Sequence, residues 1–480
     1  MDISSFIQIE KKYDLYHVEI EGINPWMYFR FPFWNFRLCK DTLGLADNLQ
    51  KSAGVMPYIY QFASAINILL RCNRRRLRKA DIILYAHSRR IKSDGYFECI
   101  YTDWLAEKYR YVTVMEDPYM HRHITPVRPK HIYYTDLLQI KSVLRGKLHK
   151  YMKTGKYRAI YAQIQKGFSA ALEEIRGAYS FGGSDHVIYD ELTRIVLEIQ
   201  VLKEELRLVL EKVQPKLIVE IVSYNKRCMA LNELAKGKGI FTIELQHGTM
   251  HKDHAAYQFS HGCGEISQFP DFVFLFSEYW KNCANLPISD ERIKVTGFPY
   301  FERQLHKYQK ADAGNEKRVN IIFISQGTIG RQMSQMAAEL CELLESDRYH
   351  IIYKLHPGEY EGWKKRNPEL LKENIEVIDS FEHNIYEYFS VCHVQVGVYS
   401  TAIYEGLAFG LATYIYDIGH ADTMEELCSQ GYAVYVKDAK ELYGHLRTDR
   451  ISRDINGKKF WKANAVENIC REIDELLEKN

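Results

Sequence analysis

From Asp81 onward, short runs of apolar and β-branched residues alternate with longer amphipathic stretches. Asp81–Ala86 (DIILYA) and Tyr111–Met115 (YVTVM) predict buried strands, and Val187–Lys212 predicts a long helix that ends before Pro215. Further strand and helix patterns follow at Leu217–Val222, Lys226–Lys236, Ile240–Leu245, Phe272–Phe276 and Ile293–Thr296. This alternation favours parallel α/β layers.

The alternation stops at a polar segment and then begins again. His306–Arg318 (HKYQKADAGNEKR) has almost nothing to bury, which is typical of a linker. After it, strands are predicted at 319–325, 351–355, 376–378, 394–398, 413–416 and 433–436, and helices at 331–345, 360–372, 384–392, 401–409 and 424–429. We therefore predict an α/β protein with two Rossmann-like domains facing a cleft, divided into residues 1–305, 306–318 and 319–480.

Composition narrows the class of protein. The 480 residues are 46% apolar, which allows two large domains with real cores. The 64 basic and 62 acidic side chains leave a net charge of +2, which argues against a nucleic-acid binder with a basic surface. The ten cysteines form no C-x-x-C pair and are typical of buried thiols in a reducing compartment. With no recognisable signal peptide or membrane span, we expect a cytoplasmic protein; a peripheral membrane role stays open.

Two segments at predicted strand ends carry side chains suited to a reaction at a phosphate-activated substrate. Gln246-His247-Gly248-Thr249 directly follows a strand, and a histidine, which titrates near neutral pH, can accept a proton from a hydroxyl nucleophile. Lys354-Leu355-His356-Pro357 ends another strand, where Lys354 and His356 project to the same face. Lysine is a compact cation for phosphate, and histidine can donate to a phosphate oxygen.

Two further segments point to the same chemistry. Gly397-Val398-Tyr399-Ser400-Thr401 leads into a predicted helix whose N-terminus, capped by Ser400 or Thr401, favours an anion such as a diphosphate. Glu405, one turn further on, is placed to accept hydrogen bonds from ribose hydroxyls. Ser325-Gln326-Gly327-Thr328-Ile329-Gly330 is a glycine-containing turn that matches neither the P-loop nor G-x-G-x-x-G. We interpret these segments as a donor site opposite His247, formed by Gln326, Gly327, Thr328, Lys354, His356, Ser400, Thr401 and Glu405.

The ordered set of motifs resembles the GT-B glycosyltransferases of bacterial surface polysaccharide synthesis. QHGT at 246–249, GFP at 297–299, KLHP at 354–357 and YST…EGL at 399–407 are similar to segments of capsule polysialyltransferases, capsular Kdo transferases and CDP-glycerol glycerophosphotransferases. The similarity covers roughly residues 214–438. It implies that His247 is the base, that Lys354, His356, Ser400 and Thr401 contact the donor phosphate, and that the acceptor is a polysaccharide or lipid-linked glycan. The polysialyltransferases carry an acidic residue where this chain has His247.

We therefore expect a metal-independent, inverting glycosyltransferase that moves a sugar from a CMP-sugar or other nucleotide-sugar to a hydroxyl of a capsule, lipopolysaccharide or related glycan. No cofactor is expected, because helix N-termini and basic side chains can hold the phosphates. Asp117, after the strand at 111–115, is the alternative base. The alternatives are a polyol-phosphate transferase, a nucleotide-sugar 2-epimerase, and a non-catalytic scaffold of a polysaccharide assembly complex.

Three other features have two interpretations each. His247, His251 and His254 have a spacing that suits zinc on a helix, but Gly248 opposes a helix and favours a histidine-rich loop that contacts substrate. The basic runs at 71–79 and 89–92 indicate either contact with anionic lipid or an acidic glycan, or a solvated helix face. The aromatic segment Trp26–Trp34 either enters a membrane interface or packs within the first domain.

Overall fold

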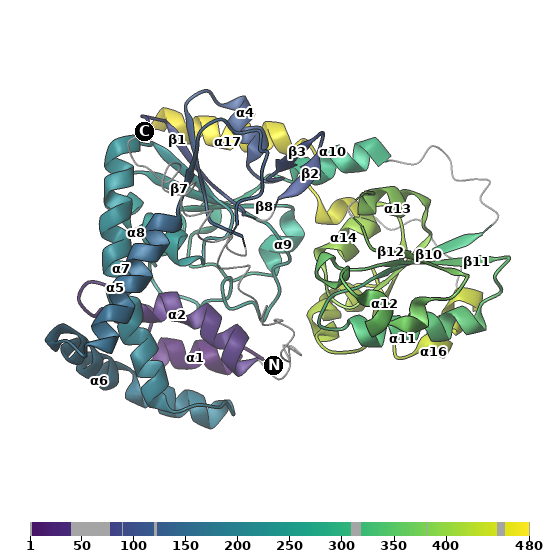
Figure 1. Ribbon diagram of the computed structural model, residues 1–480, viewed down its shortest axis with the longest axis horizontal. Helices are drawn as coiled ribbons and strands as arrows, with labels where there is room; N and C mark the ends of the chain where they lie inside the picture. The colour runs from purple at the N-terminus through teal and green to yellow at the C-terminus, as the bar shows by residue number, and fades with distance from the viewer. Residues whose placement is uncertain are drawn as a thin grey trace.

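The computed structural model is described here over residues 2–39, 77–88, 90–119, 122–308, 318–380, 382–448 and 457–479. Two sheets, of seven and six strands, form two lobes that lie side by side in Figure 1. A separate antiparallel hairpin pairs β2 (Ile91–Ser93) with β3 (Tyr96–Glu98). The predicted α/β class with two Rossmann-like domains is confirmed.

The first sheet has the order β5-β4-β1-β6-β7-β8-β9, and all its neighbouring strands are parallel. Its strands are β1 (Ile82–Ala86), β4 (Val112–Glu116), β5 (Ile132–Tyr134), β6 (Leu217–Glu220), β7 (Phe241–Leu245), β8 (Phe272–Leu275) and β9 (Ile293–Val295). The strand order reverses between β1 and β6. In open parallel sheets, ligands bind beyond the carboxyl ends of the strands at such a switch point.

The second sheet has the order β12-β11-β10-β13-β14-β15 and is also parallel throughout. Its strands are β10 (Val319–Ile324), β11 (Tyr349–Lys354), β12 (Ile375–Ile378), β13 (Val394–Gly397), β14 (Ala412–Tyr416) and β15 (Val434–Val436). The switch point lies between β10 and β13. It places the turn that starts at Ser325 beside the turn that ends at Thr401, two of the predicted donor segments.

Helices cover both sheets (Figure 1). The first domain holds α1 (Ser4–Lys12), α2 (Pro25–Phe33), α4 (Asp103–Lys108), α5 (Asp136–Tyr151), α6 (Gly155–Ala178), α7 (Asp185–Val213), α8 (Lys226–Lys236), α9 (Glu278–Asn282) and α10 (Pro299–Tyr308). The second holds α11 (Gly330–Leu343), α12 (Trp363–Arg366), α13 (Ile385–Val391), α14 (Thr401–Ala408), α15 (Glu425–Ser429) and α16 (Ala439–Thr448). The single helix predicted at 360–372 is wrong: Pro368 divides it into α12 and a 3₁₀ turn.

The aromatic segment Trp26–Trp34 is part of a buried core, which agrees with the interpretation that it packs within the first domain. The Trp26 ring lies 5.9 Å from the Phe6 ring and stacks 6.0 Å from that of Phe168 of α6. Of the basic runs, Arg71–Arg76 and Arg89 lie outside the described residues. Among the helices that are described, none has both the length and the apolar character needed to cross a bilayer.

The last helix, α17 (Ala465–Lys479), returns to the first domain. Its Ile469, Ile473 and Leu476 are buried in one cluster with residues of β1, β4, β6 and β7, and Lys294 of β9 forms an ion pair with Glu472 at 3.2 Å. The assignment of residues 319–480 to a single domain is therefore wrong for this helix. An amphipathic pattern shows that a helix has a buried face but does not show which sheet it covers. Of the predicted linker, residues 306–308 lie in α10 and 309–317 lie outside the described residues.

Candidate functional site

The switch point of the second sheet brings two predicted donor segments into contact. The hydroxyls of Thr328, after β10, and Tyr399, after β13, form a hydrogen bond. Thr328 and Gly327 are exposed, and Gln326 is half-buried. The side-chain oxygen of Gln326 is buried and makes no hydrogen bond within the described residues. A buried amide oxygen of this kind is costly unless something donates to it, so it marks a position where a ligand group would be stabilised.

Ser400, one of the two caps predicted for this helix, caps α14. Its hydroxyl oxygen accepts a hydrogen bond from the Ala402 N–H at 3.2 Å, and its backbone is extended while Thr401 begins the helix. The Ile403 N–H donates to the Ser400 carbonyl at 3.1 Å, and the helix dipole makes this end positive. The N-terminus of α14 can therefore bind an anion.

Lys354 is the last residue of β11, and His356 follows two residues later. Both lie at the carboxyl edge of the second sheet, the same edge as the turns that contain Thr328 and Ser400. The Lys354 ammonium donates a hydrogen bond to the Tyr360 hydroxyl at 2.6 Å and lies over its ring. Burial lowers the pKa of Lys354 to about 8, although Asp379 opposes the shift. The His356 Nδ1 accepts a hydrogen bond from the Gly358 N–H at 3.1 Å, so the ring also shapes its own loop.

The sequence analysis missed a buried carboxylate, Glu359, which joins the turn after β10 to the turn after β11. Glu359 Oε1 accepts a hydrogen bond from the Ser325 hydroxyl at 3.1 Å, and its Oε2 accepts one from the His356 N–H at 2.8 Å. The carboxylate also fills the space beside Gly330, where an added Cβ would lie 2.0 Å from Oε1. A single acidic residue after Pro-Gly carries no periodic signal, so only its tertiary contacts reveal it.

In the first domain, His247 lies beyond β7 near the switch point between β1 and β6. Its ring is 6.3 Å from that of His87, which follows β1, and its Nε2 lies 3.2 Å from the Tyr224 hydroxyl, beyond β6. Tyr101 donates a hydrogen bond to the His247 carbonyl at 2.8 Å. His87, Tyr101 and Tyr224 were not predicted, because nothing in their local sequence shows that these turns converge.

The ring of His247 is neutral at physiological pH. Burial, reinforced by the neighbouring His87 ring, lowers the pKa of His247 to about 3, against a smaller opposing effect of the Ile221 backbone. Its Nδ1 is buried and makes no hydrogen bond of good geometry with the described residues. A neutral imidazole can accept a proton, and a negative charge bound nearby would raise its pKa toward neutrality.

Asp117 is held in an ion pair and is poorly suited to be the alternative base. Its Oδ2 accepts hydrogen bonds from Arg227 at 2.6 Å and Asn225 at 2.9 Å, and its Oδ1 accepts them from the hydroxyls of Tyr85 and Thr135. Burial alone would raise the pKa of Asp117, but Arg227 and the hydrogen bonds lower it overall. A carboxylate with four donors is a weak proton acceptor, so this geometry favours a structural role.

Glu405 lies within α14 but is nearly buried. Burial raises the pKa of Glu405 to about 7, while a hydrogen bond from Tyr386 of α13 opposes the shift. The contact with ribose hydroxyls stays a prediction, because the described contact of this carboxyl is with protein.

The two parts of the candidate site meet at the domain junction. A Cβ built on Gly248, next to His247, would lie 3.8 Å from the Thr401 hydroxyl oxygen. The hydroxyls of Tyr279 and Tyr404 are 3.4 Å apart, and Lys252 forms an ion pair with Glu425. The His247 loop therefore faces the N-terminus of α14.

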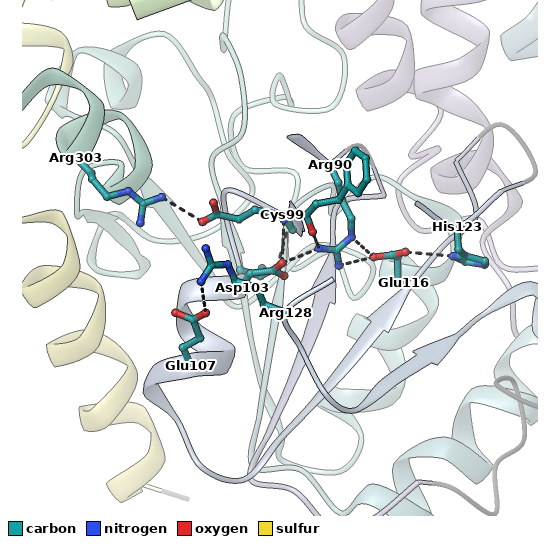
Figure 2. A network of polar contacts seen from close by, with 11 residues as sticks. Arg90, Cys99, Asp103, Glu107, Glu116, His123, Arg128 and Arg303 are labelled. Atoms are coloured by element: carbon teal, nitrogen blue, oxygen red, sulfur yellow. Dashed lines mark hydrogen bonds and ion pairs between the residues drawn. The ribbon is translucent and has the colours of Figure 1, made fainter. Parts of the chain in front are cut away.

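A charge network buttresses the first domain beside Asp117 (Figure 2). The buried guanidinium of Arg90 bridges Asp103, at 2.6 Å, and Glu116, at 2.5 Å. Glu116 and Asp136 hold His123 between them, at 3.2 and 2.8 Å. Burial would lower the pKa of His123, but these two carboxylates raise it to about 9. The network fastens the hairpin and the loop after β4 to the sheet.

The described residues hold no metal cluster, and one large cavity lies away from the predicted site residues. No group of three or more His, Cys, Asp or Glu side chains is arranged to hold a metal ion within the described ranges. A cavity of about 390 Å³ lies at the amino ends of β4 and β5, lined by basic side chains that include Arg78, Lys79, Arg110 and Lys130. This is the opposite edge of the sheet from His247.

Among the comparisons with known proteins, only the search of solved structures found similar chains. Searches against protein-family models and curated proteins found no match. UDP-GlcNAc 2-epimerase from Methanocaldococcus jannaschii is 12% identical, with 82% of this chain and 99% of that chain covered and a TM-score of 0.48. The wall teichoic acid polymerase TagF is 11% identical, with 89% and 98% covered and a TM-score of 0.41. The glycotransferase of kitacinnamycin is 12% identical, with 84% and 96% covered and a TM-score of 0.42.

Proposed function

We propose that the protein is a glycosyltransferase that moves a sugar from a nucleotide-activated donor to a hydroxyl of a surface glycan. The observation that supports this most is the meeting of two loops: Gly248 lies against Thr401 at the N-terminus of α14. This contact brings the loop that carries His247 to the helix end at which, in the proposal, the donor phosphate binds.

The second domain holds the donor in this proposal. The N-terminus of α14 and the Lys354 ammonium receive the donor phosphates, and Gln326 offers an amide oxygen to a donor group of the nucleotide. Positive charge here stabilises the phosphate as it leaves. These groups supply the electrostatic stabilisation, so the mechanism uses no metal ion.

The first domain supplies the base. The acceptor hydroxyl gives its proton to the His247 ring as its oxygen attacks the anomeric carbon, and the bond from that carbon to the phosphate oxygen breaks. A base with a pKa of about 3 is weak, but a bound diphosphate raises the pKa of His247 by favouring its protonated form. Donor binding therefore makes the His247 ring a stronger base.

The first experiment measures whether nucleotides bind. Calorimetry or thermal shift with CMP, CDP and UDP should show that the protein prefers one nucleobase. A ligand that binds only the native state raises the melting temperature. If none of these nucleotides binds, the transferase proposal fails and the scaffold interpretation stands.

The second experiment tests His247. With the preferred nucleotide-sugar, His247→Ala should lower transfer by about 10² to 10⁴-fold, the usual contribution of a general base, while nucleotide affinity stays unchanged. His383→Ala is a matched control, because that ring is exposed and 61% of its side chain is accessible. Full activity of His247→Ala would remove the assignment.

Product analysis separates the alternatives. A phosphorus-containing addition to the acceptor would show a polyol-phosphate transferase. An isomerised sugar after incubation with donor alone would show a 2-epimerase. Release of free nucleotide, together with an acceptor that gains the mass of a sugar and no phosphorus, is the result expected of the proposed sugar transfer.

A further inference from the structure

Helix α5 exposes an apolar stripe. Ile140, Leu144, Leu148 and Tyr151 are 48%, 61%, 55% and 90% exposed, and Met152, directly after the helix, is 62% exposed. Residues spaced three and four apart lie on one face of a helix. Solvated helix faces in globular proteins are usually polar, so this stripe is unusual.

The opposite face of α5 is packed and fixes the helix in this orientation. Leu138, Ser142 and Gly146 are buried, and a Cβ added at Gly146 would lie 2.7 Å from the Glu198 side chain of α7. The missing side chain lets α5 approach α7 closely. The apolar stripe therefore cannot turn inward without separating the two helices.

The segment of the chain that contains the stripe is strongly basic. Between Asp136 and Glu173 the chain has no acidic residue and eight basic ones: Lys141, Arg145, Lys147, Lys150, Lys153, Lys156, Arg158 and Lys166. The whole chain has a net charge of only +2, so this segment is a local concentration of positive charge. An apolar stripe with basic flanks suits an interface that is apolar inside and negative at its surface.

Part of this charge is neutralised by α7. Lys141 pairs with Glu205 and Lys150 with Asp190, each at 3.0 Å. Arg145, Lys147 and Lys153 form no ion pair with any described residue and are exposed. The basic flanks of the stripe thus keep three cations available for an external anion.

We propose that α5 is a docking surface for a bilayer that contains anionic lipid. The apolar stripe lies in the headgroup region, and the flanking cations contact lipid phosphates. A second copy of the chain suits this face less well, because each copy would bring the same cations against the other. The proposal does not depend on the proposed transferase activity.

The ion pairs also give the direction of α5. Lys141 lies near the later residue Glu205 of α7 and Lys150 near the earlier residue Asp190, so the two helices are antiparallel. The carbonyl of Val213, which ends α7, accepts a hydrogen bond from the Ala80 N–H, just before β1. The Tyr151 end of α5 therefore points away from the amino ends of the strands. The helices lie side by side at the left of Figure 1.

The test is cosedimentation of the full-length protein with phosphatidylcholine vesicles prepared with and without phosphatidylglycerol. The wild-type protein should bind the anionic vesicles and leave the neutral ones largely free. Replacing Arg145, Lys147 and Lys153 by glutamine should weaken binding by about fivefold per cation, and so by about 100-fold together. Leu144→Glu with Leu148→Glu should weaken it at least as much.

A matched control shows whether the effect belongs to α5. Leu371→Glu changes a leucine that is 60% exposed in the second domain and should leave vesicle binding unchanged. All the changed side chains are exposed, so circular dichroism should show the wild-type fold in every variant. A tryptophan placed at Leu144 should show a blue-shifted emission with anionic vesicles.

Four results would overturn the proposal. The first is no binding to either vesicle, and the second is equal binding to both. The third is self-association without vesicle binding, abolished by the leucine variants, which would make α5 an interface between copies. The fourth is binding to soluble polyphosphate but not to vesicles, which would show recognition of a polyanion without a bilayer.

Discussion

Replacing Gly330 with alanine should loosen two of the three turns that form the predicted donor site, the one that starts at Ser325 and the one that contains His356. The added Cβ would lie 2.0 Å from Glu359 Oε1, whereas such contacts essentially never fall below 3.0 Å, so the carboxylate must retreat by about 1 Å. That movement stretches its hydrogen bonds from the Ser325 hydroxyl, at 3.1 Å, and the His356 N–H, at 2.8 Å.

The size of the effect follows from these two bonds. A hydrogen bond to a charged group contributes about 1.5–3 kcal/mol, and the carboxylate that loses its donors stays buried. Alanine also lowers the conformational entropy of the unfolded chain, which raises the free energy of unfolding by about 0.4–1 kcal/mol. We therefore expect Gly330→Ala to lower the free energy of unfolding by about 2–5 kcal/mol.

The assay is urea unfolding followed by circular dichroism, together with calorimetry of the preferred nucleotide. Gly327→Ala is the control, because it changes the same turn at a position where a Cβ meets nothing within 4 Å. If the two variants unfold within about 0.5 kcal/mol of each other, the range of a neutral surface substitution, the Glu359 contact does not hold the turns together.

Three more predictions concern charge. Because burial lowers the pKa of Lys354 to about 8, nucleoside diphosphate affinity should fall up to tenfold per pH unit above pH 8, and calorimetry of Lys354→Met should show no such fall. Burial lowers the pKa of His251 from 6.5 to about 4, so the unfolded state binds more protons between these values. Acidification through that window should destabilise the protein by up to about 3 kcal/mol, and urea titrations of His251→Asn should show a smaller loss. Arg227→Met leaves the buried Asp117 carboxylate without its cation and should cost about 3–5 kcal/mol in urea unfolding. Arg128→Met, which breaks partly exposed pairs, should cost less than about 1 kcal/mol; equal losses would contradict the argument.

The alternation of apolar runs and amphipathic stretches predicts all six strands of the second sheet and six of the seven strands of the first, because strand and helix periodicity is local. The short strand β5 (Ile132–Tyr134) was not predicted. The parallel order then follows from crossover connections, which place successive carboxyl ends at one edge. This is why His247, Thr328 and Ser400, each recognised after a strand, lie at switch points or next to them. The cap at Ser400 also needs only its own helix.

Long-range packing decided what these local patterns left open. Asp117 and Glu405 fit their predicted roles by position, but Arg227 and Tyr386, distant in sequence, engage their carboxyls. An amphipathic helix has to bury a face, yet its sequence does not name the partner, so α17 was assigned to the wrong domain. The same limit applies to Glu359 beside Gly330 and to the outward face of α5. Periodicity is a property of neighbouring residues, whereas burial and charge pairing depend on which distant residues the fold brings together.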